Sequence, residues 1–302
     1  MKKIYLYGMI IGSNSFLLKD FLRPDEYSEI EEKHRFAGGE TGSCATVLAS
    51  LGADVTLDGT HIGRSTSQLM RDFYKDKTVD LGLLDFDDSF EGLEDYVIIS
   101  GDDRTPIGTF GKFFASAYNG GEKHWNKPDE AAIKKCDAAA IDPFFGEDSE
   151  LAAKYCVKHN KPYVTIDCKY DSFLHKNSAV SVISGEGLQN EYPDGTREEM
   201  FPLFQENGGG LTIITNGGKE FLYGRKGGEI KTFRPFAVNV KSTLGAGDTF
   251  KAGCTYALSM GMSDDELVKF ASACAAVAVS RYPMQLDPPR LAEVETMMNS
   301  RK

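Results

Sequence analysis

Short apolar segments alternate with amphipathic ones along this chain of 302 residues, and this alternation restricts the fold more than any other feature. Apolar or β-branched runs predict strands at 3–10, 55–59, 138–141, 163–167, 180–184 and 211–216. Between them, helical spacing of apolar residues predicts helices at 41–51, 65–74, 129–135 and 149–159. Strands that are apolar throughout and are separated by helices indicate a mostly parallel sheet with helices on both faces. We therefore expect a three-layer α/β fold in a single domain, residues 1–302.

The run 242–250, Ser-Thr-Leu-Gly-Ala-Gly-Asp-Thr-Phe, carries the strongest chemical signal. The chain turns tightly on Gly245, Ala246 and Gly247, and an apolar helical pattern begins at Asp248. The first N–H groups of a helix have no partner within it, and its dipole is positive there, so this turn can hold a phosphate. A carboxylate at the same place can take a proton from an attacking hydroxyl. The run therefore predicts an anion site beside a base, although a turn with an aspartate cap is the structural alternative.

A second glycine-rich block stands at 37–45, Ala-Gly-Gly-Glu-Thr-Gly-Ser-Cys-Ala, and leads into an apolar helical pattern that ends at Leu51-Gly52. Gly38 and Gly39 permit close approach of a ligand to the backbone. Together, the two blocks resemble the two signatures of the ribokinase-like (PfkB) family of sugar kinases. The resemblance extends over nearly the whole chain and implies a ribokinase-like fold.

The resemblance also implies roles for single residues. Asp248 would be the base, and Gly245, Ala246 and Gly247 would form the anion hole with the Asp248 amide. The substrate would be bound by Gly38, Gly39, Ser43, Ser13 or Asn14, and Arg104; the nucleotide would be bordered by Thr215, Gly217, Ala273 and Ala276; and the metal would be held by Glu186. Core packing for the two alanines, and plain solvation for Glu186 and Arg104, are the structural alternatives.

Several positions depart from the family pattern. Ser242 replaces the first aspartate of the signature, and Ser43 replaces the asparagine that follows the two glycines. The aspartate that family members carry shortly after the first strand is missing near Ser13, so we expect the loss of a strong charged acceptor for sugar hydroxyls. The N-x-x-E element is reduced to Glu186, and Glu220 stands where the last glycine of T-x-G-x-x-G belongs.

Two segments interrupt the strand–helix rhythm. Residues 13–36 are long, polar and charged, and residues 94–117 contain two strand-like runs around a turn. The resemblance implies that a small β lid is inserted from about 13–37 and 90–118, that it closes over the sugar, and that a homodimer forms through it. Exclusion of water by such a lid protects the phosphoryl group from hydrolysis.

Composition and absent motifs exclude several classes. A net charge of −11 argues against a nucleic-acid partner, and no run approaches the roughly 20 apolar residues that span a membrane, so a cytoplasmic location is expected. The patterns GxxxxGK[ST] and GxGxxG are absent, which excludes a P-loop and a standard dinucleotide site. The six cysteines are predicted to be reduced core residues. The histidines at 34, 61, 124, 159 and 175 are scattered, and each is predicted to be a surface or core residue rather than a ligand.

These observations predict an ATP-dependent kinase that phosphorylates a primary hydroxyl of a small sugar. Fructose-like ketoses are the first choice of acceptor, and ribose is the second. ATP and Mg²⁺ are the implied cofactors, and the resemblance also allows a monovalent cation. A fructosamine kinase and a nucleoside kinase keep the chemistry and change the acceptor. A non-catalytic sugar- or nucleotide-binding regulatory protein on the same fold is the alternative from another class.

Overall fold

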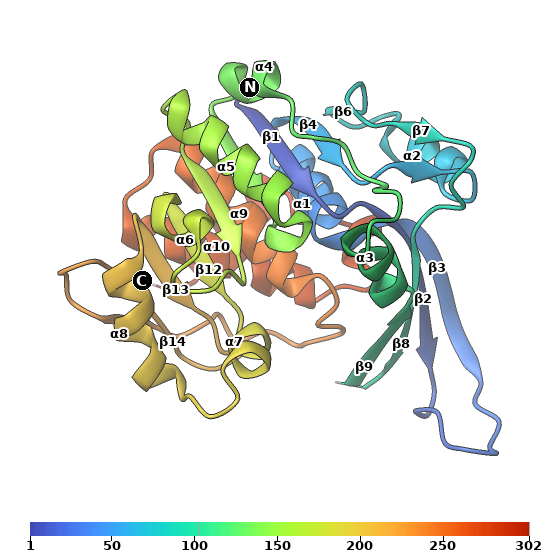
Figure 1. Cartoon of the computed structure of the whole chain (residues 1–302). Coiled ribbons are helices and arrows are strands. Elements are labelled where there is room, and N and C mark those ends of the chain that lie inside the picture. Colours follow the sequence, from blue (N-terminus) through green and yellow to red (C-terminus); the bar gives the residue numbers. More distant parts are fainter. Residues whose placement is uncertain (102, 302) are drawn as a thin grey trace.

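The computed structural model describes residues 1–101 and 103–301 (Figure 1). Its strands are β1 (Lys3–Gly8), β2 (Ile11–Leu18), β3 (Ile30–Gly38), β4 (Asp54–Gly59), β5 (Ile62–Gly63), β6 (Val79–Asp80), β7 (Phe86–Asp87), β8 (Glu94–Ser100), β9 (Asp103–Gly108), β10 (Ala138–Ile141), β11 (Tyr163–Ile166), β12 (Val180–Ile183), β13 (Leu211–Ile214), β14 (Phe221–Arg225) and β15 (Lys231–Phe233). Its helices are α1 (Gly39–Ser50), α2 (Ser67–Tyr74), α3 (Phe110–Tyr118), α4 (Glu130–Lys135), α5 (Glu147–Lys158), α6 (Phe173–Asn177), α7 (Gly185–Glu191), α8 (Arg197–Asn207), α9 (Ala246–Met260), α10 (Asp264–Val279) and α11 (Leu291–Asn299), with 3₁₀ turns η1 (Pro143–Phe145) and η2 (Met284–Leu286).

The main sheet has nine strands in the order β15-β14-β13-β12-β11-β10-β1-β4-β6. Neighbouring strands from β6 to β13 pair in parallel, whereas β14 and β15 pair antiparallel at one edge. The predicted strands and the predicted α/β class are confirmed. The chain order reverses at β1, between β4 and β10, and ligands of such sheets bind outside the carboxyl ends of the strands at this kind of point.

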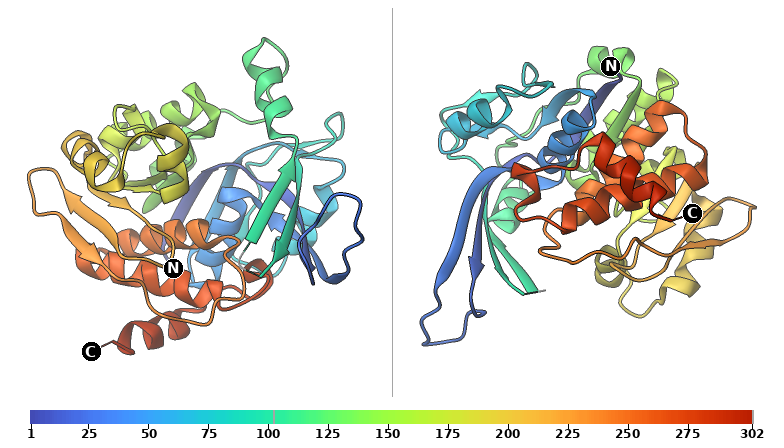
Figure 2. Two further views of the ribbon diagram at one scale, coloured as in Figure 1. Left: turned by 90° about the horizontal axis from the view of Figure 1, so that it is seen from below. Right: turned by 180° about the vertical axis from the view of Figure 1, so that it is seen from behind.

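Helices cover both faces of the main sheet, as predicted. Side chains of β1 alternate between two cores: Ile4 and Leu6 pack in the cluster that contains α1, α9 and α10, and Tyr5 and Tyr7 pack in the cluster that contains α4 and α5. In the right panel of Figure 2, the red C-terminal helices lie across the first of these faces. The alternation follows from the period of two along a strand, so an apolar strand supplies both cores at once.

The two segments for which a lid is predicted form a separate sheet of four strands in the order β3-β2-β8-β9, which we call the small sheet. It stands away from the body of the molecule (Figure 1). Pro106 is tolerated in β9 because that strand lies at the sheet edge. The residues after β9 are not extended to 117, because Phe113 and Ala117 share one helical face and bury it, which makes α3 a helix.

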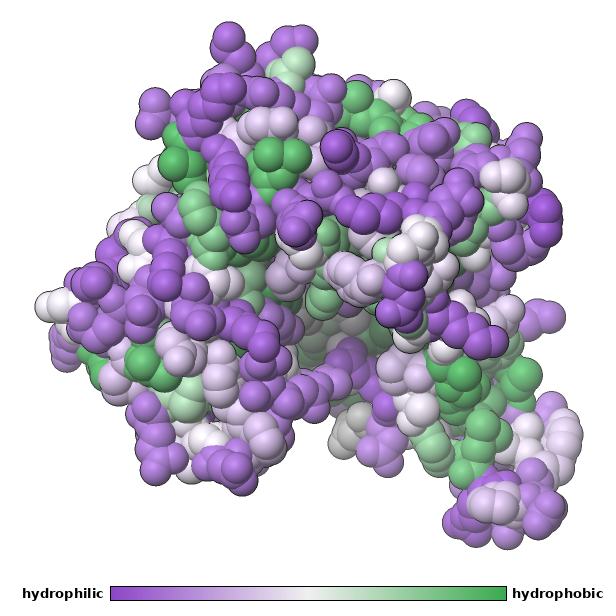
Figure 3. Space-filling model, viewed as in Figure 1, coloured by the Kyte–Doolittle hydropathy of each residue, from purple (hydrophilic) through white to green (hydrophobic). Residues whose placement is uncertain are grey.

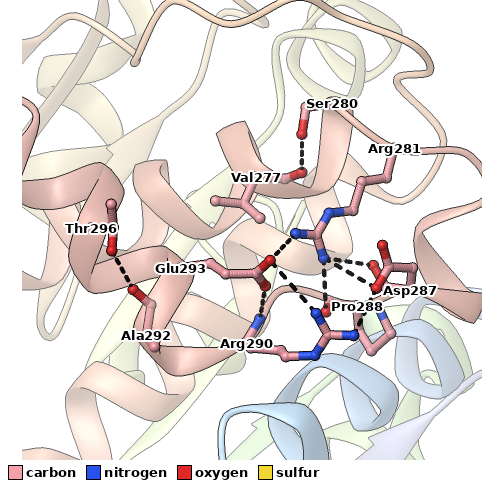
Figure 4. Close-up of polar contacts among 9 residues, drawn as sticks. All are labelled: Val277, Ser280, Arg281, Asp287, Pro288, Arg290, Ala292, Glu293 and Thr296. Carbon is pink, nitrogen blue, oxygen red and sulfur yellow. Dashed lines mark hydrogen bonds and ion pairs between the residues drawn. The ribbon is translucent and has the colours of Figure 1, made fainter.

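A cluster of charged side chains fixes the chain between α10 and α11 (Figure 4). Arg281 donates to the carbonyl of Pro288 at 3.2 Å and contacts the Glu293 carboxylate, and Arg290 donates to Asp287 at 3.1 Å. The backbone amide of Arg290 donates to Glu293 at 2.9 Å and so caps α11. The cluster closes the segment that contains η2, which returns to the carboxyl edge of the sheet.

Two further expectations concern the chain as a whole. The six cysteines are free and buried, as predicted. Among the described residues, no helix combines the length and the apolarity that a membrane crossing requires.

The contact between α9 and α10 depends on Gly253. A Cβ at this position would lie 2.7 Å from the Ala271 Cα, which is closer than real Cβ atoms come to backbone. We expect Gly253→Ala to lower the free energy of unfolding by about 1–3 kcal/mol, because the two helices must move apart. The measurement is urea unfolding, with Gly111→Ala as control. Nothing lies within 4 Å of a Cβ at Gly111, so that variant should be neutral or gain up to about 1 kcal/mol; equal losses in both would contradict the packing argument.

Candidate active site

A cleft of about 1270 Å³ runs along the carboxyl ends of the main-sheet strands and under the small sheet. Figure 3 shows the surface hollowed at this place. The volume exceeds the upper end of about 1000 Å³ that is usual for a site of one small ligand, so the cleft has room for two substrates side by side. Its lining includes Ser13, Glu40, Asp95, Arg104 and Asp248 at one end and residues after β12 and β13 at the other.

The glycine-rich turn and the start of α9 lie in the floor of the cleft. Gly245, Ala246, Gly247 and Asp248 all line it, as the sequence predicts. Gly245 is the N-cap residue and has a φ of 76°, a left-handed conformation that favours glycine. A Cβ there would also lie 2.7 Å from Met284. Gly247 has no atom within 4 Å of a Cβ position, so a ligand can approach the first amides of the helix.

Lys251 lies one helical turn after Asp248 and is fully buried, with 1% of its side chain exposed. Its Nζ donates to Oδ1 of Asp142, which directly follows β10, at 2.5 Å. The other oxygen of Asp142 accepts a hydrogen bond from the Thr41 hydroxyl of α1, also at 2.5 Å. Gly8 permits this arrangement, because a Cβ there would overlap Asp142 Oδ2 at 2.2 Å. One buried cation thus ties α9 to β10 and, through Asp142, to α1.

The cleft holds two carboxyl groups whose pKa values are raised by burial. Burial, followed by the charge of Asp142, raises the pKa of Asp248 to about 7, although Lys251 opposes the shift. Burial and the charge of Asp248 raise the pKa of Glu40, in the first turn of α1, to about 8. A carboxylate with a pKa near the working pH is well matched to general-base catalysis. Burial therefore raises the pKa of both carboxyl groups toward neutrality, and the charge of Asp248 adds to the shift of Glu40.

The end of the cleft that contains Ser13 has a carboxylate that the sequence did not predict. Ser13 lines the cleft, and Asp95 lies directly opposite it in the pairing of β2 with β8. Burial raises the pKa of Asp95 to about 6, and its Oδ1 is buried with no hydrogen-bond partner among the described residues. The neighbouring strand thus places a carboxylate in the region where the sequence lacks the expected aspartate. Asn14 does not line the cleft, because successive residues of a strand face opposite sides, and its amide donates to the Asp95 carbonyl at 3.2 Å.

The glycine pair and Ser43 occupy the base of this end. Gly39 lines the cleft and has a φ of 77°, and a Cβ there would lie 2.5 Å from the Met9 carbonyl oxygen. Gly38 does not line the cleft; its missing side chain makes room for Ser13, whose Oγ would be 2.0 Å from a Cβ. Ser43 lines the cleft and accepts a hydrogen bond from Nε2 of Gln285 in η2 at 3.3 Å. The Gln285 Oε1 is buried without a partner in the described part of the chain.

The other end of the cleft is more apolar. Thr215 and Gly217, which follow β13, line it as predicted, and so does Ala276 of α10. Ala273 does not: it is fully buried in the core, because it faces the opposite side of α10. Helical rotation brings Ser272, Ala275 and Val279 to the cleft with Ala276 instead.

Arg104 and Glu186 meet above the anion turn. Arg104 of β9 donates to the carbonyl of Thr243 at 3.1 Å, and its other nitrogen lies 3.5 Å from the Glu186 carboxylate. Glu186 is 76% exposed at the start of α7. Asp167, beside it in the cleft, accepts hydrogen bonds from the amide and hydroxyl of Ser184, and burial raises its pKa. The small sheet is thus joined directly to the glycine-rich turn.

Sequence reasoning missed Asp142, Lys251, Asp95, Asp167 and Gln285. Asp142 directly follows the predicted strand at 138–141, and Asp167 is the last residue of the predicted strand at 163–167, so their position at the carboxyl edge was an available signal. Lys251 was detectable as a lysine in an otherwise apolar helix. Asp95 and Gln285 had no such signal, because strand register and a distant turn place them.

The comparisons with known proteins agree with this geometry. Residues 1–290 match the model of the pfkB family carbohydrate kinases, and the chain belongs to this family. The 5-dehydro-2-deoxygluconokinase of Clostridium beijerinckii is 22% identical, covering 91% of this chain and 87% of that protein. The Arabidopsis thaliana ribokinase complexed with ribose and ATP superposes with a TM-score of 0.80 at 17% identity over 98% of both chains. A ribokinase II of E. coli in complex with ATP and Mg²⁺ superposes with a TM-score of 0.77 at 18% identity over 99% of this chain and 100% of that one.

The fold is therefore ribokinase-like, and the protein is a carbohydrate kinase. Its reaction is the ATP-dependent phosphorylation of a hydroxyl on a small sugar or sugar derivative.

The buried ion pair gives a test of stability. Lys251→Met leaves the Asp142 carboxylate buried without its cation, and loss of one partner of such a pair costs about 3–5 kcal/mol. We expect the double variant Lys251→Met/Asp142→Asn to recover much of this loss, because the neutral amide removes the buried charge and still accepts from Thr41. Chemical unfolding of the three proteins measures the difference. Equal stability of the single and the double variant would contradict the role given to Lys251.

The raised pKa of Asp248 predicts the pH dependence of turnover. Its carboxylate must be ionised to accept a proton, so kcat/KM should fall about tenfold per pH unit below the pKa of about 7. Glu40→Gln should keep this acid limb, because Glu40 is already neutral there. A profile that is flat between about pH 5 and 8 would contradict the assignment.

The same shift makes ionised Asp248 a destabilising group. The pKa of Asp248 is about 7 in the folded protein and 3.8 in the unfolded chain. The free energy of unfolding therefore falls as the pH rises from the lower value through the higher one. Asp248→Asn should therefore be more stable than the parent protein at alkaline pH, and equally stable below the unfolded pKa.

Proposed function

We propose that the protein transfers the γ-phosphoryl group of ATP to a primary hydroxyl of a small neutral sugar. Fructose-like ketoses are the first choice of acceptor, and ribose-like sugars are the second. The observation that carries the proposal is the position of Asp248. It combines a pKa of about 7 with a place beside Gly245 and Gly247 at the N-terminus of α9, in a cleft that continues to Ser13 and Asp95.

Asp248 takes the proton of the sugar hydroxyl as its oxygen attacks phosphorus. A new oxygen–phosphorus bond forms, the bond to the ADP oxygen breaks, and the proton leaves on the Asp248 carboxyl group. The amides of Gly245, Ala246, Gly247 and Asp248 stabilise the charge on the phosphoryl oxygens. Arg104, which reaches the Thr243 carbonyl, adds a positive charge close to this position.

The residues at the other end fit a nucleotide. Small and apolar side chains of α10, among them Ala276 and Val279, form a surface for a planar base, and Thr215 and Gly217 border it. Gly217 has a φ of 55° and no atom within 4 Å of a Cβ position, so phosphates can pass close to the backbone. Glu186 would hold Mg²⁺, largely through water and the ATP phosphates, since Mg²⁺ keeps several waters in such sites. The ion supplies charge neutralisation between the phosphates.

The charge of the sugar end favours a neutral substrate. Glu40, Asp95 and Asp248 supply three carboxyl groups there, against the single guanidinium of Arg104. Asp95, whose Oδ1 has no partner among the described residues, and protonated Glu40 provide an acceptor and a donor for sugar hydroxyls. An anionic sugar would have to enter against this field when the carboxyl groups ionise.

A sugar acid is the second candidate, favoured by Arg104 and by the name of the Clostridium relative, a gluconate-derivative kinase. A carboxylate could accept a bidentate pair from the guanidinium in place of Glu186. Nucleoside and fructosamine kinases differ only in the acceptor and belong in the same assay. A non-catalytic regulatory protein is disfavoured, because a protein that only binds sugar has no need of a base beside an anion turn, and Asp95 supplies a carboxylate at the sugar end.

The small sheet acts as the lid in this proposal, with insertions at about 13–37 and 90–118. Its exposed Tyr96 and Ile107 pair across β8 and β9 and give it an apolar surface on which a homodimer would form. A monovalent-cation requirement stays a prediction. The six free, buried cysteines support a reducing, cytoplasmic location.

The decisive experiment measures ADP release from Mg·ATP with ketoses, aldoses, sugar acids, fructosamines and nucleosides as acceptors. We expect one class to support turnover and Asp248→Asn to lower kcat by at least roughly 10²–10⁴, the usual contribution of a positioned base. Asp95→Asn should instead raise KM for the sugar and leave KM for ATP unchanged, because Asp95 lies at the sugar end.

Asp76→Asn, which changes an exposed aspartate outside the cleft, is the matched control and should behave as the parent protein. Turnover of Asp248→Asn near the parent value would exclude Asp248 as the base. A lack of turnover with every acceptor, with ligands still raising the melting temperature, would support the regulatory protein.

A further inference from the structure

Two histidines and one aspartate meet at the base of the small sheet, outside the cleft. The ligand atoms of His61, Asp87 and His124 lie within 4.8 Å of one another, and they form the single group of this kind found among the described residues. Oδ2 of Asp87 is 4.0 Å from Nδ1 of His61 and 3.9 Å from Nδ1 of His124. The three side chains are between 15% and 22% exposed.

Backbone pairing brings the three residues together from distant parts of the chain. The amide of His61 donates to the carbonyl of His124 at 2.9 Å, beside the antiparallel bridge between Thr60 and Trp125. Strand β5, which follows His61, pairs in parallel with β7, so that Gly63 is opposite Asp87. The arrangement therefore depends on rigid backbone contacts and not on flexible surface side chains.

The hydrogen bonds of His61 determine which of its ring nitrogens carries a lone pair. The side-chain amide of Asn126 donates to the Leu83 carbonyl at 2.8 Å, which turns its oxygen toward His61. That oxygen lies 3.1 Å from Nε2 and accepts its proton, since an amide oxygen cannot donate. In the neutral ring, Nδ1 then presents a lone pair to a carboxylate oxygen.

The other two side chains are also held in place. Oδ1 of Asp87 accepts from the amide and the hydroxyl of Ser89, at 2.8 and 2.6 Å, and these bonds lower the pKa of Asp87. Oδ2 is left to face the imidazoles. The ring of His124 stacks on Phe90, with centroids 4.1 Å apart and planes inclined by 7°. Nδ1 of both histidines is buried and has no hydrogen-bond partner in the described part of the chain.

We propose that His61, Asp87 and His124 bind a divalent transition-metal ion of the zinc type. Two imidazoles and one carboxylate suit Zn²⁺ or Co²⁺, whereas Mg²⁺ prefers an all-oxygen shell. Ligand atoms of a tetrahedral site with bonds of about 2.0–2.1 Å stand about 3.3 Å apart, so small side-chain rotations bring these atoms into range. Ser89 and Asn126 supply the outer hydrogen bonds that orient metal ligands. The proposed site departs from the sequence-based prediction, in which His61 and His124 are surface or core residues and not ligands.

The position of the three residues indicates a structural clamp. Asp87 lies just before the chain enters β8, and His124 lies just after it leaves α3, so the two mark the ends of the second insertion of the small sheet. His61 follows β4 of the main sheet. A metal ion here joins both ends of the insertion to the body of the protein.

The test is Zn²⁺ binding to the chelator-treated whole protein, measured in competition with a chromophoric chelator. We expect one equivalent to bind tightly to the parent protein. Asp87→Asn and His124→Gln should each weaken binding by at least about 100-fold, because even outer-sphere partners of a metal site contribute 10–100-fold. Co²⁺ should give the visible absorption bands of a four-coordinate site in the parent protein and lose them in both variants.

Two further variants keep the result interpretable. His159→Gln removes a histidine whose Nε2 lies 2.7 Å from the Glu130 carboxylate, outside the proposed site, and the variant should bind Zn²⁺ as the parent does. Asp248→Asn should do the same, since the cleft carboxylates are not the ligands. Equal affinity of the parent protein and Asp87→Asn, or loss of the bound equivalent in Asp248→Asn, would overturn the proposal. Kinase activity retained by Asp87→Asn and His124→Gln shows that these variants are folded.

Discussion

The ion pair between Lys251 and Asp142 holds the active site together. It joins α9, which carries Asp248, to the end of β10, and the second oxygen of Asp142 holds the first turn of α1 through Thr41. These elements come from three distant parts of the chain and meet where the strand order of the main sheet reverses. A buried ion pair rarely increases stability over an apolar packing of the same volume. The contribution of this pair is to position the active site, because it fixes the N-termini of α9 and α1 against the end of β10.

The same pair explains why the neighbouring carboxyl groups titrate near neutrality. Lys251 is a buried cation in this cluster, and it is paired directly with Asp142. Asp248 and Glu40 consequently lie close together with little compensation, and burial raises the pKa of both. The pKa of about 7 at Asp248, the proposed base, thus follows from burial with too little positive charge nearby to offset it. Arg104 of the small sheet also lies close enough to Asp248 for its charge to lower the pKa of that carboxyl group.

Local sequence patterns predicted the features that lie within one segment, and failed where distant segments meet. The alternation of apolar strands and helices was sufficient for the α/β class, and the turn at 245–248 was found because its residues are contiguous. Ser13 lines the cleft and Asn14 does not, because successive strand residues face opposite sides. Ala276 lines it and Ala273 does not, because the two lie on different sides of α10. Motif matching alone could not decide which residue of each pair faces the cleft. Asp95 was invisible in the sequence because the pairing of β2 with β8 determines that it stands beside Ser13. The same holds for the group of His61, Asp87 and His124, whose members are separated by many residues in the chain.

Strand β3 ends at Gly38, and helix α1 begins at Gly39, with no connecting loop between them. The small sheet and the first turn of α1 are therefore continuous through the glycine pair. The turn that bears Glu40 and Ser43 follows the glycine pair directly, and the amide of Thr41 donates to the Met9 carbonyl at 3.0 Å. In the proposed reaction, the sheet that lies over the sugar and the helix turn that carries Glu40 and Ser43 are therefore one backbone unit, with no flexible joint between them.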